Sequence, residues 1–236
     1  MSLAARLSAI DDRIADAARQ AGRDPGEITR IVVTKFHPAS LVSELRALGV
    51  TDVGENRQQE LTAKRAAVEE AAQHAGGSDG RSPLRWHFIG QAQTNKAAAI
   101  RRASDVVHSV DRVRLADALH RAADGDEVCD VLVQVNLTRD AGRGGADIAE
   151  AEQLAEHVLG LDSLRLRGVM AVAPLDEEPA AAFARLSAVA DSIRRLAPSA
   201  TWVSAGMTGD FVEAIHAGAT HLRIGSAITG PRPARG

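Results

Sequence analysis

The sequence predicts an α/β fold, a single (β/α)8 barrel of the TIM type preceded by an N-terminal helix. Eight short apolar runs alternate with segments rich in Ala, Leu, Arg and Glu at helical spacing, a pattern typical of parallel βαβ units. Most runs are apolar at consecutive positions, as expected for strands that helices cover. Eight units in about 200 residues match the size of such a barrel. A doubly wound sheet is the alternative, but it does not require eight units.

The first element is a helix. Leu3, Leu7, Ile10, Ile14 and Ala17 recur at helical spacing, which predicts an amphipathic helix over residues 3–20, closed by the glycine at position 22.

The strands follow in order along the rest of the chain. We expect residues 1–231 to form one domain, with a mobile Gly/Ser/Pro-rich loop at 74–84 and a disordered tail at 232–236. The predicted strands are 28–35, VTDVGEN (50–56), RWHFIG (85–90), DVVHSV (105–110), DVLVQVN (130–136), a run ending in GVMAV (166–172), TWVSAGM (201–207) and THLRIGS (220–226).

Composition narrows the class of partner. The formal net charge is −3 and the pI is about 6.2, so we expect neither nucleic acid nor an anionic membrane surface as partner. The single cysteine, Cys129, cannot form an intramolecular disulfide. No run of about 18 apolar residues occurs. We therefore expect a cytoplasmic protein that binds a small molecule.

The chemistry in such a barrel gathers where strands end. Lys35 ends the first predicted strand, although a lysine is costly to bury without compensation. The last two strands run into the glycine-containing turns SAGMTGD (204–210) and RIGSAITG (223–230), and glycine turns at helix starts favour bound phosphate. A lysine that can form an imine, together with a phosphate site, indicates pyridoxal phosphate.

Other predicted strands carry Asn56, His87 and Arg223 at or near their ends, and each of these residues, like Lys35, also has a structural interpretation. Lys35 could extend to solvent, Arg223 could be an ion-pair partner, His87 a hydrogen-bonded core histidine and Asn56 a helix cap. His216 and His221 are the histidines considered for metal binding, and no Cys/His/Asp cluster accompanies them. We therefore expect no metal site.

Several motifs carry a resemblance to a known family. VVTKFHP, VTDVGENRQQE, LRWHFIGQAQTNK, HSVDRVRLA, VSAGMTGDFVEAI and THLRIGSAITG are closely similar to the pyridoxal phosphate homeostasis proteins, whose fold resembles the N-terminal barrel of alanine racemase. The resemblance covers roughly residues 5–231 in order.

This resemblance implies a set of site residues. Lys35 matches the lysine that holds the cofactor as an aldimine, and Arg223 matches an arginine that faces the pyridine nitrogen. Asn56 and His87 lie in motifs at the pocket. The residues matching the phosphate-binding turns are Ser204, Met207, Thr208, Gly225 and Ser226. In the loop at 136–147, Arg143 stands where relatives often carry lysine, and an arginine forms no stable imine in proteins, so a second covalent contact there is in doubt.

The function that the resemblance implies is that of a carrier. It would bind, buffer and deliver pyridoxal phosphate to apo-enzymes, as a monomer and without robust catalytic activity. One alternative is a racemase or related enzyme using the same cofactor; another is a cofactor-free aldolase that uses Lys35 directly. Racemisation requires a base on each face of the substrate, and the chain contains no tyrosine to serve as the second.

Overall fold

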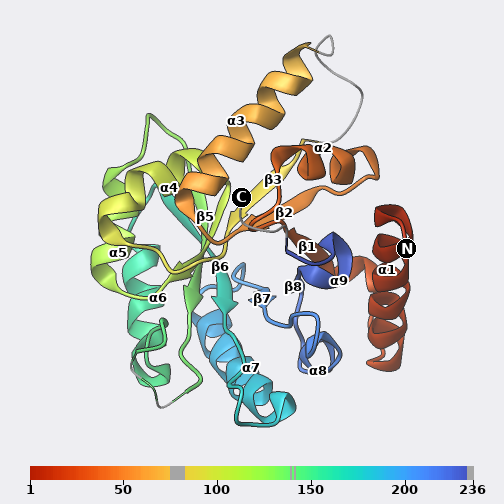
Figure 1. Cartoon of the computed structure of the whole chain (residues 1–236). Coiled ribbons are helices and arrows are strands. Elements are labelled where there is room, and N and C mark those ends of the chain that lie inside the picture. Colours follow the sequence, from red (N-terminus) through yellow and green to blue (C-terminus); the bar gives the residue numbers. More distant parts are fainter. Residues whose placement is uncertain (75–82, 139, 141, 233–236) are drawn as a thin grey trace.

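The computed structural model describes residues 1–74, 83–138, 140 and 142–232. Its strands form a closed parallel barrel in sequence order, which confirms the predicted fold class (Figure 1). The strands are β1 (Thr29–Val33), β2 (Asp52–Glu55), β3 (Arg85–Phe88), β4 (Val106–Val110), β5 (Cys129–Gln134), β6 (Leu164–Met170), β7 (Trp202–Ser204) and β8 (His221–Ile224).

Helices surround the barrel and connect the strands (Figure 1). The N-terminal helix α1 has the predicted bounds, and its buried face contacts the two helices at the other end of the chain. There Arg6 Nε donates a hydrogen bond of 2.6 Å to the carbonyl of Ile228. The helices are α1 (Leu3–Gln20), α2 (Ala39–Ala47), α3 (Gln58–His74), α4 (Ala97–Ala103), α5 (Val113–Arg121), α6 (Ala151–Leu159), α7 (Pro179–Leu196), α8 (Phe211–His216) and α9 (Ser226–Thr229), with short 3-10 turns at Pro25–Glu27, Thr94–Lys96 and Ile148–Glu150.

Most observed strands are shorter than the predicted apolar runs, and β6 is as long as its run but begins and ends two residues earlier. β1 ends at Val33, two residues before the predicted end, because the chain turns at Phe36, whose φ of 71° lies outside the extended region. Lys35 therefore lies in the turn after β1 and not in the strand itself. Most of the predicted loop at 74–84 and all but one residue of the predicted tail lie outside the described residues.

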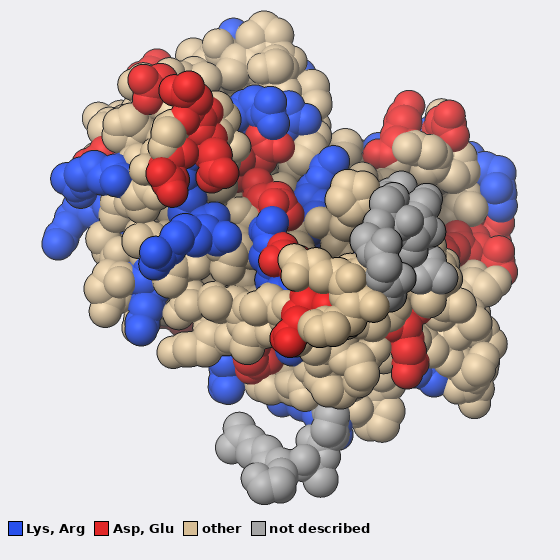
Figure 2. Space-filling model, turned by 90° about the horizontal axis from the view of Figure 1, so that it is seen from above, with Lys and Arg blue, Asp and Glu red and all other residues tan. Residues whose placement is uncertain are grey.

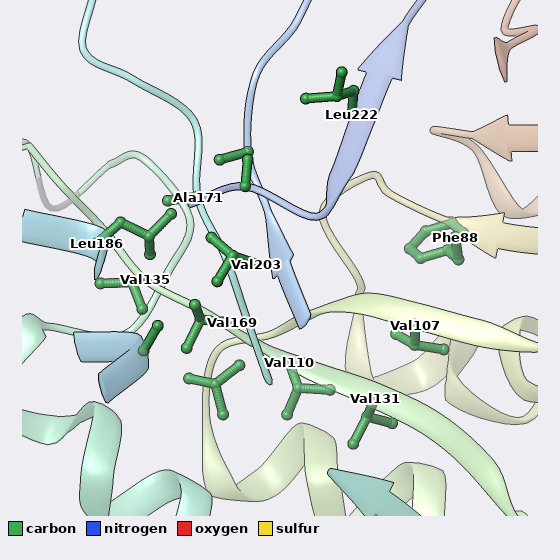
Figure 3. Close-up of a cluster of buried hydrophobic side chains, with 14 of the residues drawn as sticks. Phe88, Val107, Val110, Val131, Val135, Val169, Ala171, Leu186, Val203 and Leu222 are labelled. Atoms are coloured by element: carbon green, nitrogen blue, oxygen red, sulfur yellow. The ribbon is translucent and has the colours of Figure 1, made fainter. Parts of the chain in front are cut away.

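The main core lies between the barrel and its helices. Figure 3 shows part of this layer, where Leu186 of α7 lies near Val169 of β6 and Val203 of β7, and valines of β4 and β5 continue the layer farther from it. A separate small cluster consists of Val106, Leu132 and Met170 with Trp202 packed against it. Successive side chains of a strand point to opposite faces, and Val107, Val131, Val169 and Val203 all belong to the outer core. The small cluster therefore lies inside the barrel.

On the face shown in Figure 2, acidic and basic side chains are interspersed, and neither kind of charge covers the face alone. None of the helices in the described residues is both long and apolar enough to span a membrane.

A buried ion pair supports the turn that carries Lys35. Lys64 of α3 is 7% exposed, and its Nζ lies 2.7 Å from Glu55 Oε1 and donates a 2.8 Å hydrogen bond to the carbonyl of Thr34. The Thr34 hydroxyl donates to the same carboxylate oxygen at 2.6 Å. Glu55 is fully buried, and burial raises the pKa of its carboxyl group. The pair therefore joins α3 and β2 to the end of β1.

Replacing Lys64 tests this support. We expect Lys64→Met to lower the free energy of unfolding by about 3 kcal/mol at neutral pH, since it leaves a buried carboxylate without its cation. The loss should shrink on acidification. The pKa of Glu55 is raised in the native state, and we expect it to rise further in the variant, which lacks the ammonium group. As the pH falls, the native variant therefore binds a proton at Glu55 before the unfolded chain does. This proton uptake stabilises the native state at lower pH. Urea unfolding at about pH 7 and about pH 5.5 measures this.

The matched control removes an exposed ion pair. Arg19 and Asp16 are 2.6 Å apart with exposed side chains, so Arg19→Met should cost less than about 1 kcal/mol at both pH values. If Lys64→Met lowered the free energy of unfolding equally at both pH values, the proposed role of the Glu55–Lys64 pair would be contradicted.

Gly90 allows two turns to approach each other closely. A Cβ at this position would lie 1.9 Å from the backbone oxygen of Asn56. We expect Gly90→Ala to destabilise the fold by about 2 to 4 kcal/mol, because backbone must move to relieve the overlap. Gly160→Ala is the control: its Cβ would meet the nearest atom, the His157 oxygen, at 3.4 Å, and the change should cost less than about 1 kcal/mol. Comparable unfolding midpoints for the two variants would show that the turn adapts freely.

Candidate functional site

A cavity of about 380 Å³ lies at the carboxyl ends of β1, β2, β7 and β8. This volume is within the range typical of small-molecule sites. Most of the residues that the sequence singled out line this cavity. Those present are Lys35, Asn56, Met207, Thr208, Arg223, Gly225 and Ser226.

The Lys35 side of the cavity is built on a strained turn. Phe36 has a positive φ, which is rare for a large side chain, and its backbone N–H donates a 2.8 Å hydrogen bond to Glu60 Oε2. The Phe36 ring is surrounded by cations, with the guanidinium of Arg232 at 4.5 Å, that of Arg57 at 5.3 Å and the Lys35 ammonium at 5.9 Å from its centroid. This edge of the cavity therefore favours an anionic ligand.

The opposite wall consists of the turns after β7 and β8. Gly206 has a φ of 89°, and a Cβ there would lie 2.7 Å from the Cβ of Ala214, so the first turn requires glycine. Thr208 and Ser226 bring hydroxyl groups to the lining. The resemblance places Met207 in a phosphate-binding turn. In the structure, its backbone N–H donates a 2.6 Å hydrogen bond to Asp210 Oδ1. Met207 borders the cavity, but its N–H is occupied by the start of α8.

Arg223 brings a buried charge to the cavity. It is 5% exposed, and burial lowers its pKa to about 10. Its Nη1 donates to Ser204 Oγ and its Nη2 to the carbonyl of Ala171, both at 2.8 Å. A guanidinium has five N–H donors, so others stay available to a ligand.

Ser204 and His87 are not among the residues that line the cavity. Ser204 is fully buried, with its hydroxyl between Arg223 and His108. His87 is also fully buried, bonded to Asp52 and His108. Both side chains point into the barrel interior from strands whose next residues face the outer core, and they lie behind the cavity lining. For His87, the interpretation as a hydrogen-bonded core histidine describes what is observed.

Sequence reasoning missed other lining residues. His37 lines the cavity two positions after Lys35, and burial together with the charge of Lys64 lowers its pKa. Its place in the motif VVTKFHP was a signal that could have been used. Val33, Ile89, Val172 and Thr229 also line the cavity, but nothing in their local sequence separates them from core residues.

Asn56 and Arg143 differ in their relation to the cavity. Asn56 Oδ1 is buried without a hydrogen-bond partner in the described residues, which leaves one polar atom of the lining for a ligand to satisfy. Arg143 is not part of the lining. Across the described ranges, no group of three or more His, Cys, Asp or Glu side chains is arranged to hold a metal ion.

Comparison with known proteins gives a consistent result. Residues 6–233 match the family "Alanine racemase, N-terminal domain". The pyridoxal phosphate homeostasis protein of Mycobacterium tuberculosis is 39% identical over 241 residues, covering 97% of this chain and 92% of that protein. The protein of the same name from Pseudomonas aeruginosa is 36% identical, covering 98% and 96%.

A solved structure extends the comparison to the fold. The structure of PipY from Synechococcus elongatus with pyridoxal phosphate (PLP) bound has a TM-score of 0.80 and 31% identity, and it covers 97% of this chain and 100% of PipY. Since near-full-length relatives exceed 30% identity and the family match spans almost the whole barrel, the chain belongs to the pyridoxal phosphate homeostasis proteins.

Proposed function

We propose that this protein binds pyridoxal 5'-phosphate and serves vitamin B6 homeostasis by buffering the cofactor and delivering it to apo-enzymes. One observation carries the proposal: an amine, a guanidinium and two hydroxyls line a single cavity, from Lys35, Arg223, Thr208 and Ser226. The names of its relatives and the PLP-bound PipY structure support the same ligand. We further propose that residues 1–231 form one cofactor-binding domain and that the protein acts as a cytoplasmic monomer.

The lining fits this cofactor chemically. Pyridoxal phosphate supplies an aldehyde, which condenses with a primary amine with loss of water. Arg223 is a donor only, so it suits an unprotonated ring nitrogen. The hydroxyls of Thr208 and Ser226 can donate to phosphate oxygens, and the cations near Phe36 favour its charge.

Lys35 is the best placed attachment point. The chain has three lysines, Lys35, Lys64 and Lys96. Of these, Lys64 is held by Glu55, and Lys96 lines a separate cavity of about 160 Å³. We therefore assign the covalent bond to Lys35 Nζ.

Borohydride reduction tests this assignment. After incubation with pyridoxal phosphate and reduction, the wild-type protein should gain one pyridoxyl group, and peptide mapping should locate it on Lys35. Lys35→Ala should remain unlabelled while keeping its fold, and Lys96→Ala should label like the wild type. A pyridoxyl group on Lys64 or Lys96 in the wild-type protein would overturn the assignment. An absence of cofactor binding would overturn the function.

We also propose that the protein is not an amino-acid racemase. A racemase needs a second base opposite the lysine. The chain has no tyrosine, and His87 lies outside the cavity lining. Arg223 would keep the ring nitrogen unprotonated, which makes the ring a weak electron sink. His37 does line the cavity, so it is the side chain that a two-base mechanism would use.

Hydrogen exchange distinguishes the two functions. In heavy water with saturating cofactor, we expect the α-hydrogen of L-alanine to exchange no faster than with free pyridoxal phosphate. His37→Gln should leave this background rate unchanged. Stereospecific exchange well above background, lost in both Lys35→Ala and His37→Gln, would instead identify an enzyme with two bases.

A further inference from the structure

An unbroken series of hydrogen bonds leads from Arg223 into the barrel interior. Arg223 Nη1 lies 2.8 Å from Ser204 Oγ. The same oxygen lies 2.9 Å from His108 Nδ1, whose ring continues through Nε2 to His87 Nδ1 at 2.8 Å. His87 Nε2 lies 2.9 Å from Asp52 Oδ1. All five side chains are buried, and the two histidines are fully so.

These side chains lie on the inner face of the barrel. The neighbours of His87, Trp86 and Phe88, belong to the outer core, as do Leu222 and Ile224 on either side of Arg223, so by strand alternation the two side chains point inward. Because β4 and β7 are not adjacent strands, the bond from His108 to Ser204 crosses the interior. The series thus joins Asp52, at the start of β2, to an arginine of the cavity.

The two ends of the series determine its direction. An ionised carboxylate only accepts hydrogen bonds, and a guanidinium only donates them. Burial would raise the pKa of Asp52, but hydrogen bonds from His87 and Thr51 lower it below its ordinary value, so Asp52 is a carboxylate. Burial also lowers the pKa of both His87 and His108, which keeps the two rings neutral.

With neutral rings, each step follows from the previous one. His87 donates from Nε2 to Asp52, so its Nδ1 accepts from His108 Nε2. The Nδ1 of His108 then accepts the Ser204 hydroxyl, whose oxygen accepts from Arg223. Every hydrogen bond of the series is then donated in the direction of Asp52, and both nitrogens of each ring have a partner.

We propose that Asp52, His87, His108 and Ser204 form a positioning chain of fixed direction that orients the Arg223 guanidinium toward the cavity. These are positioning residues, since only Arg223 lines the cavity. The link to cofactor affinity rests on the proposed function, whereas the direction of the chain does not. The interior thereby sets the geometry of the wall opposite Lys35, and Ser204 and His87 act through Arg223.

Removal of the acceptor at the far end provides a sharp test. In Asp52→Ala, the Nε2–H of His87 loses its acceptor, and the buried donor is costly. The chain can reverse: His87 then donates from Nδ1 to His108 Nε2, and His108 donates from Nδ1 to Ser204 Oγ, which can accept two hydrogen bonds. The donor without an acceptor then becomes the Ser204 hydroxyl, which can rotate, instead of the His87 ring, which is fixed by its neighbours. The deletion should therefore change the tautomer of His108, a residue that Asp52 does not touch.

Nitrogen NMR of ¹⁵N-histidine-labelled protein without ligand reads these tautomers. In the wild-type protein, both rings should be neutral with the proton on Nε2, and they should stay so at about pH 6, where a free histidine is largely charged. In Asp52→Ala, both should carry the proton on Nδ1. The control is Asp117→Ala, which removes the carboxylate 2.7 Å from His157 Nε2 on the outer helices and should leave His87 and His108 unchanged.

Cofactor affinity tests the effect on Arg223. His108→Leu leaves the buried Ser204 hydroxyl without its acceptor, and we expect it to weaken pyridoxal phosphate binding by about tenfold, the equivalent of one buried hydrogen bond. His108→Gln carries a donor and an acceptor at similar spacing and should stay within about threefold of the wild-type affinity. Unfolding measurements on both variants verify that they fold.

The outcomes separate the two proposals. A wild-type His87 or His108 that is charged or carries its proton on Nδ1, or an unchanged His108 in Asp52→Ala, would overturn the chain even if the cofactor binds. Equal affinity of the Leu and Gln variants would overturn its effect on Arg223. A wild-type protein that shows the predicted tautomers but binds no pyridoxal phosphate would leave the chain standing and overturn the proposed function.

Discussion

The closure of one parallel sheet on itself is the constraint on which the other features depend. β1 pairs in parallel with both β2 and β8, so Val32 lies opposite Val53 on one side and Ile224 on the other. All carboxyl ends of the strands therefore meet at one end of the barrel. Lys35 and Arg223, which are far apart in the sequence, come to line the same cavity because the first and last strands are neighbours.

Closure also creates an interior that must be filled. Its apolar part includes the small cluster of Val106, Leu132 and Met170 with Trp202, and it also holds the polar side chains of Asp52, His87, His108, Ser204 and Arg223. Buried polar groups are costly unless they are hydrogen-bonded. The positioning chain from Asp52 to Arg223 meets this requirement with charged groups at both ends and neutral histidines between them. The same bonds that satisfy the interior also hold a residue of the cavity.

The turn after β1 combines strain with support. Phe36 adopts a conformation that costs energy for a non-glycine residue, and the Glu60 carboxylate and the Lys64 ammonium bond the backbone on either side of Lys35. Such a turn leaves the chain little freedom to move the lysine. A binding protein gains from this arrangement, since a preorganised site loses less entropy on binding.

The sequence by itself determined the fold class, the bounds of α1 and several of the cavity-lining residues, because hydrophobic periodicity and glycine turns are local signals. The tertiary structure alone decided where Ser204, His87 and His37 lie relative to the cavity. Ser204 and His87 lie on strands in motifs that resemble a cofactor site, yet their partners, His108, Arg223 and Asp52, come from other strands. Which face a strand turns inward, and what meets it across the barrel, depends on closure and register, which no local pattern encodes.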